Sequence, residues 1–460
     1  ETMASHRSFT GRSIGAVSLL PFADKSKPFI VIGANERGGS AYPLPALELR
    51  AEEGGEDGTE AGLVTCSYAD HLGGVTALCA GKVNSHASAT PAFLLAGSDR
   101  GALSLYPVTS SGESGVPPML GAPPPSGGEN WSPATTNGAP VFRGFWSSAA
   151  GGWASGAASR RGDGAGAAPV VGLALSRDSA RAGVLLESGL LTVHALAGLG
   201  GPALASFPSV DSLDARGLCW RGDGDRSLFT VGAQHLKLWD VATGGRDTRP
   251  VLHIGDRSLA SSPCSYTSVA VPPGDQDKVV CGTSDGRIVV WDLRMPGTSA
   301  HAVACKTAHP PLPFQAGGAH NSATRDGGGG MFDQFTGESG SGRSAAGVAC
   351  LEFHPADPTV LFSGGGDDGC MVLNNLSADS GFYSSDSAID DGGFAGGRSA
   401  SWRTVLAGPA VAGSDEAYVP PACVAIAFDA ETNFLAAAFD NEALTTIHRH
   451  PRLGRGGRFM

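Results

Sequence analysis

Short apolar runs, each bounded by turn-forming residues, recur along this chain. The clearest example is the stretch 282–292, in which a Gly-Thr-Ser-Asp-Gly turn leads into a β-branched run that ends in Trp291-Asp292. Asp285-Gly286 is typical of a tight hairpin, where glycine accepts the positive φ that other residues resist. The β-branched run is typical of a buried strand. The stretch therefore predicts two antiparallel strands joined by a short turn.

Groups of three such runs recur seven times. Repeats of about 40–45 residues with this pattern build a β-propeller, a ring of small antiparallel sheets. We therefore predict an all-β fold, a single seven-bladed WD-repeat β-propeller over residues 14–450, with residues 1–13 and 451–460 as flexible termini. The seven groups lie at about residues 14–44, 75–106, 169–194, 215–240, 266–292, 348–375 and 423–447.

Four segments between these runs are dominated by Gly, Ala, Ser, Pro or acidic residues. The chain contains 68 glycines, and many of them lie in these segments. Such compositions cannot bury enough side chain to offset the entropy of ordering, so we expect disordered loop insertions. They span about residues 51–62, 109–168, 310–346 and 377–420.

Charge and cysteine usage restrict the partners and the compartment. The formal net charge of −12 disfavours direct binding of nucleic acid, because such binders are more often basic. The nine cysteines include no CxxC pair, and most lie in apolar runs, as buried thiols in a reducing compartment do. The start of the chain lacks the apolar segment of a signal peptide, and no run reaches the roughly 18 apolar residues of a membrane span. We expect a soluble intracellular protein without membrane insertion.

Aromatic and turn residues at repeated positions are expected to shape the blades rather than to bind a partner. An aromatic residue at the end of a third strand fills the space between neighbouring blades, and an Asp-Gly pair closes the preceding hairpin. A Phe-His-Pro sequence is expected to form the turn between a first and a second strand. The expected blade-structural residues are Tyr106, Trp239, Asp240, Asp285, Gly286, Trp291, Asp292, Phe353, His354, Asp368 and Gly369.

Three patterns that resemble functional motifs lack the context that their chemistry needs. Residues 282–286 fit the Gly-x-Ser-x-Gly nucleophile elbow, but a strand follows where that motif needs a helix. The four glycines at 327–330 are not followed by the Lys-Ser/Thr of a phosphate loop. Asp367-Asp368 and the neighbouring acids do not have the spacing of a calcium-binding loop. We expect no catalytic residue, no cofactor and no metal site.

Two Trp-Asp strand endings, the Phe353-His354-Pro355 turn and a distinctive closing segment at residues 438–450 occur together in this chain. In this combination residues 214–376 and the closing segment resemble the WD-repeat nucleoporins of the Y-shaped outer-ring complex of the nuclear pore. Asn374 stands where an aromatic residue is expected, so we expect the sixth blade to pack more loosely. The segments that carry the resemblance are 228–231, 235–240, 278–286, 289–294, 306–309, 352–358, 361–363, 367–369 and 438–450.

The resemblance implies a non-enzymatic scaffold subunit of the nuclear pore complex. Such a subunit would lie at the nuclear envelope, bind other nucleoporins of the Y complex, in particular a helical nucleoporin of its short arm, and support protein and mRNA transport.

Two alternatives remain open on the sequence alone. One is a WD-repeat adaptor of another complex, either a ubiquitin-ligase substrate receptor or a chromatin-peptide reader, and a reader should carry an aromatic or acidic ring around the central channel. The other is an enzyme or a small-molecule-binding propeller, which is disfavoured because no convergent set of acid, base or metal-binding residues is visible.

Overall fold

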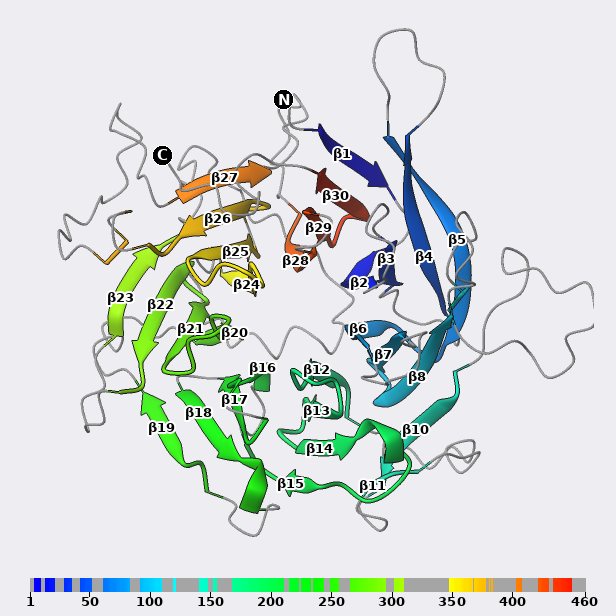
Figure 1. Cartoon of the computed structure of the whole chain (residues 1–460), viewed down its shortest axis with the longest axis horizontal. Helices are drawn as coiled ribbons and strands as arrows, with labels where there is room; N and C mark the ends of the chain where they lie inside the picture. Colours follow the sequence, from blue (N-terminus) through cyan, green and yellow to red (C-terminus); the bar gives the residue numbers. More distant parts are fainter. Residues whose placement is uncertain are drawn as a thin grey trace, which may run out of the picture.

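The computed structural model is an all-β structure in which seven small antiparallel sheets form a closed ring (Figure 1). This architecture confirms the seven-bladed β-propeller that the repeats predict. No helix in the described residues is long and apolar enough to cross a membrane. The structure describes residues 4–9, 13–20, 29–34, 42–51, 61–82, 92–109, 119–120, 140–147, 152–154, 168–210, 215–222, 225–232, 235–243, 249–255, 265–294, 302–309, 347–366, 368–377, 380, 382–383, 403–407, 421–429 and 433–448.

The blades follow one another in chain order around the ring, and six of them use strands that are consecutive in sequence. From the innermost strand outward, blade 1 consists of β2 (Ile14–Leu20), β3 (Phe29–Ala34), β4 (Tyr42–Ala51) and β5 (Ala61–His71), and blade 2 consists of β6 (Val75–Lys82), β7 (Ala92–Ser98), β8 (Ala102–Thr109), β10 (Phe142–Ser147) and β11 (Gly152–Ala154), with β9 (Met119–Leu120) also beside β8. Blade 3 consists of β12 (Val170–Leu175), β13 (Arg181–Leu186), β14 (Leu191–Ala195) and β15 (Ala205–Phe207), blade 4 of β16 (Ala215–Trp220), β17 (Ser227–Gly232), β18 (His235–Asp240) and β19 (Leu252–Gly255), and blade 5 of β20 (Tyr266–Ala270), β21 (Lys278–Thr283), β22 (Arg287–Asp292) and β23 (Ala302–Thr307). Blade 6 consists of β24 (Val348–Phe353), β25 (Val360–Gly365), β26 (Met371–Asn375) and β27 (Arg403–Ala407), and blade 7 of β28 (Cys423–Asp429), β29 (Phe434–Phe439), β30 (Ala443–His448) and β1 (Ala4–Phe9).

All seven innermost strands share one irregularity. In each of them the register shifts by one residue directly after the first pair, so that one extra residue faces the second strand of the blade. Such a bulge bends its strand and increases the local twist. The ring therefore repeats the same bend at the same depth in every blade. The extra residues are Gly15, Thr76, Val171, Arg216, Thr267, Ala349 and Val424.

The hydrophobic core lies between blades. Between blades 4 and 5, Phe229 and Val231 of β17 pack in one cluster with Tyr266, Val279 and Trp291. Each blade buries both faces in this way, which is why its second strand is largely apolar: β3, β7, β17, β25 and β29 are buried along their whole length. The alternation of apolar and polar residues typical of a half-exposed strand is therefore missing from these runs.

The ring closes through a strand from each end of the chain. β1 pairs antiparallel with β30 from Ala4↔His448 to Phe9↔Ala443, and it forms the outer edge of blade 7. Arg7 secures this strand, because its Nε donates to Thr445 Oγ1 at 3.3 Å and its guanidinium lies 5.7 Å from the Phe439 ring centre. The predicted boundary at residue 14 therefore leaves out a strand of the propeller. Residues 451–460 lie outside the described residues.

Parts of three predicted insertions belong to blades. The segment 109–168 contains β9, β10 and β11, and Trp153 of β11 is fully buried in the cluster between blades 2 and 3. Within 377–420, β27 is the outer strand of blade 6. The segment 51–62 begins and ends in the long strands β4 and β5. The expectation of disorder is wrong for these strands, and the segment 310–346 lies outside the described residues.

Deleting residues 1–9 should open the ring at blade 7. Without β1, the backbone of β30 becomes an unpaired sheet edge, which exposes its amides and favours aggregation. We expect hydrogen exchange over residues 443–448 to accelerate by at least about tenfold, whereas β18 in blade 4 keeps its protection as an internal control. Unchanged protection of β30 in the truncated chain would show that β1 does not close the ring.

Candidate functional site

The stretch 282–292 forms a hairpin of blade 5. Gly286 has a φ of 81°, and the Asp285 carboxylate accepts a hydrogen bond from Thr283 Oγ1 at 2.5 Å and pairs with Arg287. After this turn the chain continues as β22 rather than as a helix. The turn therefore lacks the strand-turn-helix geometry of a nucleophile elbow, and Ser284 is a turn residue.

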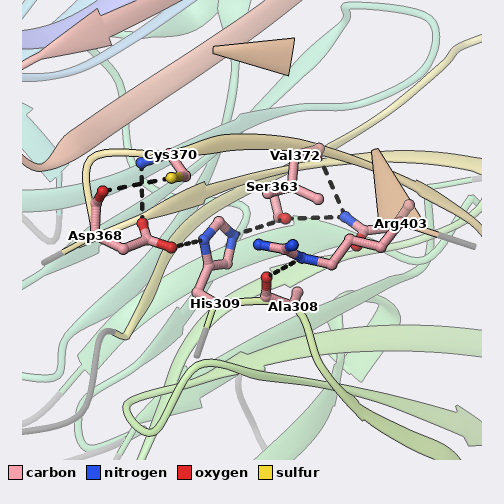
Figure 2. A network of polar contacts seen from close by, with 8 residues as sticks. Ala308, His309, Ser363, Asp368, Cys370, Val372 and Arg403 are labelled. Carbon is pink, nitrogen blue, oxygen red and sulfur yellow. Dashed lines mark hydrogen bonds and ion pairs between the residues drawn. The ribbon is translucent and has the colours of Figure 1, made fainter. Parts of the chain in front are cut away.

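This turn also positions the end of the outer strand of its own blade. The carbonyl oxygen of Gly286 accepts hydrogen bonds from the backbone N–H groups of both Ala308 and His309, each at 3.0 Å. A second contact fixes the same segment from blade 6, since Arg403 Nε of β27 donates to the carbonyl oxygen of Ala308 at 2.7 Å. Between these two anchors the His309 side chain is directed into blade 6 (Figure 2).

A buried polar network connects His309 to blade 6 (Figure 2). His309 Nδ1 lies 2.8 Å from Asp368 Oδ2, and His309 Nε2 lies 2.9 Å from Ser363 Oγ. Asn374 Nδ2 donates to the same Ser363 Oγ at 2.9 Å. The His309 ring thus lies between the Asp368 carboxylate and the Ser363 hydroxyl, and that hydroxyl oxygen also accepts from the Asn374 amide. One loop, one hairpin turn and two strands are joined in this way.

The order serine, histidine, aspartate matches the hydrogen-bond order of a hydrolase triad, but the setting does not. His309 and Ser363 are fully buried and Asp368 is 4% exposed. The serine oxygen is already occupied by the Asn374 amide, so no substrate carbonyl can reach it. The hydrogen bonds of His309 to Ser363 and Asp368 cross the blade boundary and favour one packing arrangement, although Asn374 Oδ1 has no hydrogen-bond partner among the described residues. We interpret this network as the link between blades 5 and 6.

One contact of this network, the Asn374–Ser363 hydrogen bond within blade 6, has a counterpart within blade 4. Trp239 Nε1 donates to Thr230 Oγ1 at 2.8 Å, and Thr230 occupies in β17 the position that Ser363 occupies in β25. Asn374 therefore takes over the donor role of the tryptophan indole. Asn374 is fully buried, so the sixth blade is held by polar contacts at the point where the sequence suggested looser packing.

Blade 5 has the indole but lacks the acceptor. Trp291 is 1% exposed, and its Nε1 has no hydrogen-bond partner among the described residues. Cys281 stands in β21 where Thr230 and Ser363 stand in their blades. A thiol is a weak acceptor, so the blade with the clearest sequence signature contains an unsatisfied buried donor.

Tyr106 occupies the corresponding position in blade 2 and uses a third solution. It is fully buried, and its hydroxyl oxygen lies 3.0 Å from Nδ1 of His71, which ends the outer strand of blade 1. Burial, helped by the nearby charge of Arg143, lowers the pKa of His71 to about 3. The imidazole is therefore neutral at physiological pH and serves as a hydrogen-bond partner between blades 1 and 2.

The remaining predicted residues lie at turns and blade boundaries. Asp240 Oδ1 accepts from the backbone N–H of Ala242 and so begins the short 3-10 turn η3 (Val241–Thr243). Asp292 has its pKa lowered to about 2, mainly by the hydrogen bond from Arg294. The Phe353-His354 turn packs on blade 7, with the His354 ring 4.6 Å from that of Phe428. Gly369 has a φ of 61° in the turn that carries Asp368.

Glu352 is an acidic residue that the sequence patterns did not single out. It lies on β24, the innermost strand of blade 6, and burial raises the pKa of its carboxyl group to about 7. The matching positions of the other innermost strands carry no charge; they are Ser18, Cys79, Ala174, Cys219, Ala270 and Ala427.

The outer edge of the ring carries a row of exposed apolar side chains. Five large apolar residues of the described chain are exposed, and each lies in or directly before the outer part of a different blade, from blade 2 to blade 6. In blades 2, 3 and 4 the backbone N–H of the exposed residue donates to the residue before the third-strand position, which is Leu105, Val193 or Leu238; in blade 5, Val303 is a bulge residue beside the pair Trp291↔Ala302. The five are Val141 (60% exposed), Leu204 (46%), Val251 (66%), Val303 (45%) and Val405 (46%). We call this set the rim row.

Metal binding finds no support in the described part of the chain. There, no group of three or more histidine, cysteine, aspartate or glutamate side chains is placed to hold an ion. Asp367 lies outside the described residues, and Asp368 is already engaged with His309.

Substitutions at Thr230 and Cys281 test whether a hydroxyl on the second strand stabilises a blade by accepting the hydrogen bond of the buried indole. Thr230→Val, which keeps the shape of the side chain, leaves the Trp239 indole unsatisfied and should lower stability by about 1–3 kcal/mol. Cys281→Ser gives the Trp291 indole an acceptor and should raise stability by about 1 kcal/mol. Urea unfolding followed by tryptophan fluorescence measures both. A destabilising Cys281→Ser together with an unchanged Thr230→Val would contradict this role.

The raised pKa of Glu352 predicts a pH-dependent cost to the fold. Between its usual pKa of 4.5 and about 7, the folded chain keeps a proton that the unfolded chain releases, so stability contributed by this group falls as pH rises. Glu352→Gln mimics the protonated form. The Tm difference between variant and wild type should be small near the usual pKa of 4.5 and increase in favour of the variant as the pH rises through about 7. A constant difference would show that Glu352 ionises normally.

Comparison with known proteins bears on the fold. No family model matches this sequence, and no curated protein sequence matches it. Among solved structures 1203 chains match, so the architecture is widespread and does not by itself identify a partner. One of them, a chain from the crystal structure of the mitotic checkpoint complex, has a TM-score of 0.51 and 13% sequence identity over 97% of this chain and 94% of that chain. At this identity the likeness shows the fold alone, a seven-bladed β-propeller.

Proposed function

We propose that this chain is a non-enzymatic scaffold subunit of the Y-shaped outer-ring complex of the nuclear pore, in which its rim binds a helical nucleoporin. The main support is that the segments of resemblance and a group of exposed apolar side chains occur on the same three blades. The segments of 214–376 that resemble WD-repeat nucleoporins form blades 4, 5 and 6, which are neighbours in the ring (Figure 1). The outer parts of these blades expose Val251, Val303 and Val405.

The rim row suits a helical partner. Apolar side chains on successive outer strands offer repeated contacts to the apolar face of an amphipathic helix. Exposed apolar groups of this kind mark interaction surfaces more often than isolated ones do. Aspartate at one of these positions would leave a charge buried without a partner in the complex, which is costly.

The closed ring also supports a scaffold role. A blade that buries both faces against its neighbours has little freedom to move as a unit, and a rigid surface loses little conformational entropy on association. The buried link between blades 5 and 6 adds to this rigidity on the arc that carries the resemblance, since it joins His309 to Ser363 and Asp368.

A peptide reader is less well supported than a rim-binding scaffold. A reader of basic peptides needs converging acids or aromatic residues near the centre of the ring. At the level of Glu352, the innermost strands contribute one carboxylate and otherwise small uncharged side chains, such as Cys219 and Ala427. One acidic residue is not a ring of acids.

Affinity capture from cell extract, with quantitative mass spectrometry, tests the proposal. The wild-type chain should recover nucleoporins of the Y complex, and the double variant Val251→Asp/Val303→Asp should reduce their recovery at least about tenfold. Val141→Asp is the matched control, because Val141 belongs to the rim row on blade 2, outside the segments of resemblance. Glu352→Gln tests the centre of the ring. Both controls should keep the partners, and thermal melts should show all variants folded.

Two results would overturn the proposal. Recovery of ubiquitin-ligase or histone-modifying subunits in place of Y-complex nucleoporins would assign the chain to another complex. Loss of partners with Glu352→Gln, together with full recovery by the double rim variant, would move the binding surface to the centre of the ring.

A further inference from the structure

Two cysteine thiols meet at the boundary between blades 6 and 7. Cys350 lies on β24 and Cys423 on β28, the innermost strands of the two blades. The Cys350 thiol donates to the carbonyl oxygen of Cys423 with Sγ 3.4 Å from the oxygen. The two residues thus approach each other across the blade boundary, although 73 positions separate them in sequence.

Gly364 shows how close the two sulfurs are. A Cβ atom at this glycine would lie 2.6 Å from Cys350 Sγ and 2.7 Å from Cys423 Sγ, closer than carbon and sulfur can pack. Both thiols therefore border the same small space, which exists because position 364 has no side chain. Gly364 is the partner of Cys350 in the pairing of β25 with β24, so the space is part of the regular sheet.

The two thiols differ in access. Cys350 is partly exposed, whereas Cys423 is fully buried. The hydrogen bond with the Cys350 thiol, followed by burial, raises the pKa of Cys423 well above its ordinary value. Cys423 therefore stays protonated and is reached by a solvent-borne oxidant later than Cys350. This is the arrangement of an accessible thiol next to a resolving thiol.

Cys219 and Cys281 provide an internal comparison at the boundary between blades 4 and 5, where both belong to one apolar cluster. Burial raises the pKa of Cys219 to about 12, and it raises that of Cys281 further. The Cys219 thiol donates to the carbonyl oxygen of Trp220, the next residue of its own strand. The Cys350 thiol, in contrast, donates to the other cysteine of its pair, which brings the two residues into direct contact.

We propose that Cys350 and Cys423 form a disulfide when the protein meets hydrogen peroxide, and that this bond joins blade 6 covalently to blade 7. In the first step Cys350 sulfur attacks one peroxide oxygen, which gives a sulfenic acid at Cys350 and one water. In the second step the Cys423 thiol loses its proton as its sulfur attacks the Cys350 sulfur, the S–S bond forms while the S–O bond breaks, and the sulfenic oxygen takes up that proton and leaves as a second water. Two thiols and one peroxide thus give one disulfide and two waters.

The bond would act on the blade that closes the ring. Blade 7 depends on β1 from the far end of the chain, and the disulfide would hold its innermost strand to blade 6 independently of that pairing. A cross-link between positions this far apart in sequence restricts the unfolded chain strongly, which raises the stability of the folded form.

Peptide mapping of the intact chain under non-reducing conditions tests the proposal. The full-length protein is treated with hydrogen peroxide at equimolar to tenfold excess, then digested and analysed by mass spectrometry. We expect a linked pair of peptides containing positions 350 and 423, two hydrogens lighter than their sum, and a rise in Tm of about 3–5 °C that dithiothreitol reverses. Cys219→Ser is the matched control and should keep both effects.

Variants separate the proposal from general oxidation. Cys350→Ser should abolish the link and the Tm shift, while unoxidised Cys350→Ser melts within about 2 °C of the reduced wild type. Cys423→Ala should also abolish the link. If this variant does not fold, the peptide map of the wild-type chain still shows whether the disulfide between positions 350 and 423 forms. The proposal is overturned by a link that involves Cys219, Cys281 or Cys370 instead, by sulfinic acid at Cys350 without any link, or by a 350–423 link that leaves the Tm unchanged.

Discussion

The pairing of β1 with β30 is the constraint on which the rest of this ring depends. Every blade buries both faces of its sheet against its neighbours, so an open row of seven blades would leave two large apolar faces in water. Closing the row brings blades 1 and 7 together, and Ile30 and Ile32 then share a cluster with Phe434 and Leu444. This contact has to hold between the two ends of a long chain. β1 precedes β2 of blade 1 in the chain but pairs with β30 of blade 7, so its ladder hydrogen bonds hold the start of the chain to the last blade, and this is the most distant backbone pairing in the molecule's described part.

The sequence predicts the three inner strands of a blade far better than the outer one. β7, β17 and β25 are recognisable because both faces are buried, so the run is mostly apolar, with only a serine or threonine interrupting it. The outer strands face solvent on part of their surface. β23, for instance, alternates between exposed and partly buried positions, with one buried residue. Insertions also separate some outer strands from the rest of their blades, and β10 and β27 are missed because they lie in segments rich in glycine and serine. β1 is missed because it is a short polar strand that pairs with the far end of the chain, so no local sequence pattern predicts it.

The polar link between blades escaped prediction for a related reason. Its members come from a loop after one blade and from two strands of the next, with His309 separated from Asp368 by 59 positions and from Ser363 by 54. No spacing rule connects such residues before the topology is known. A weaker signal was available, since a hydroxyl residue stands at the same strand position in blades 4 and 6, nine residues before Trp239 and eleven before Asn374. Comparison of that position across blades would have suggested that Asn374 replaces the tryptophan as hydrogen-bond donor. In the sequence alone, the missing aromatic ring instead suggested loose packing.

Comparison of the blades separates what the ring requires from what a partner could recognise. Different residues occupy the third-strand position of Trp239 and the second-strand position of Thr230 in the other blades. The pairs are Trp239 with Thr230, Trp291 with Cys281, Tyr106 with Ala96 and Asn374 with Ser363. The interior therefore tolerates side chains of different size and hydrogen-bonding capacity at both positions. A partner does not contact these groups, so their variety says nothing about binding. The rim row behaves in the opposite way: it is exposed, it places a large apolar side chain on the outer part of five successive blades, and the ring gains no core packing from it. Repetition of one chemistry without a folding reason is what an interaction surface requires, and this is why the outer strands, rather than the well-formed hairpin of blade 5, are where a partner is to be sought.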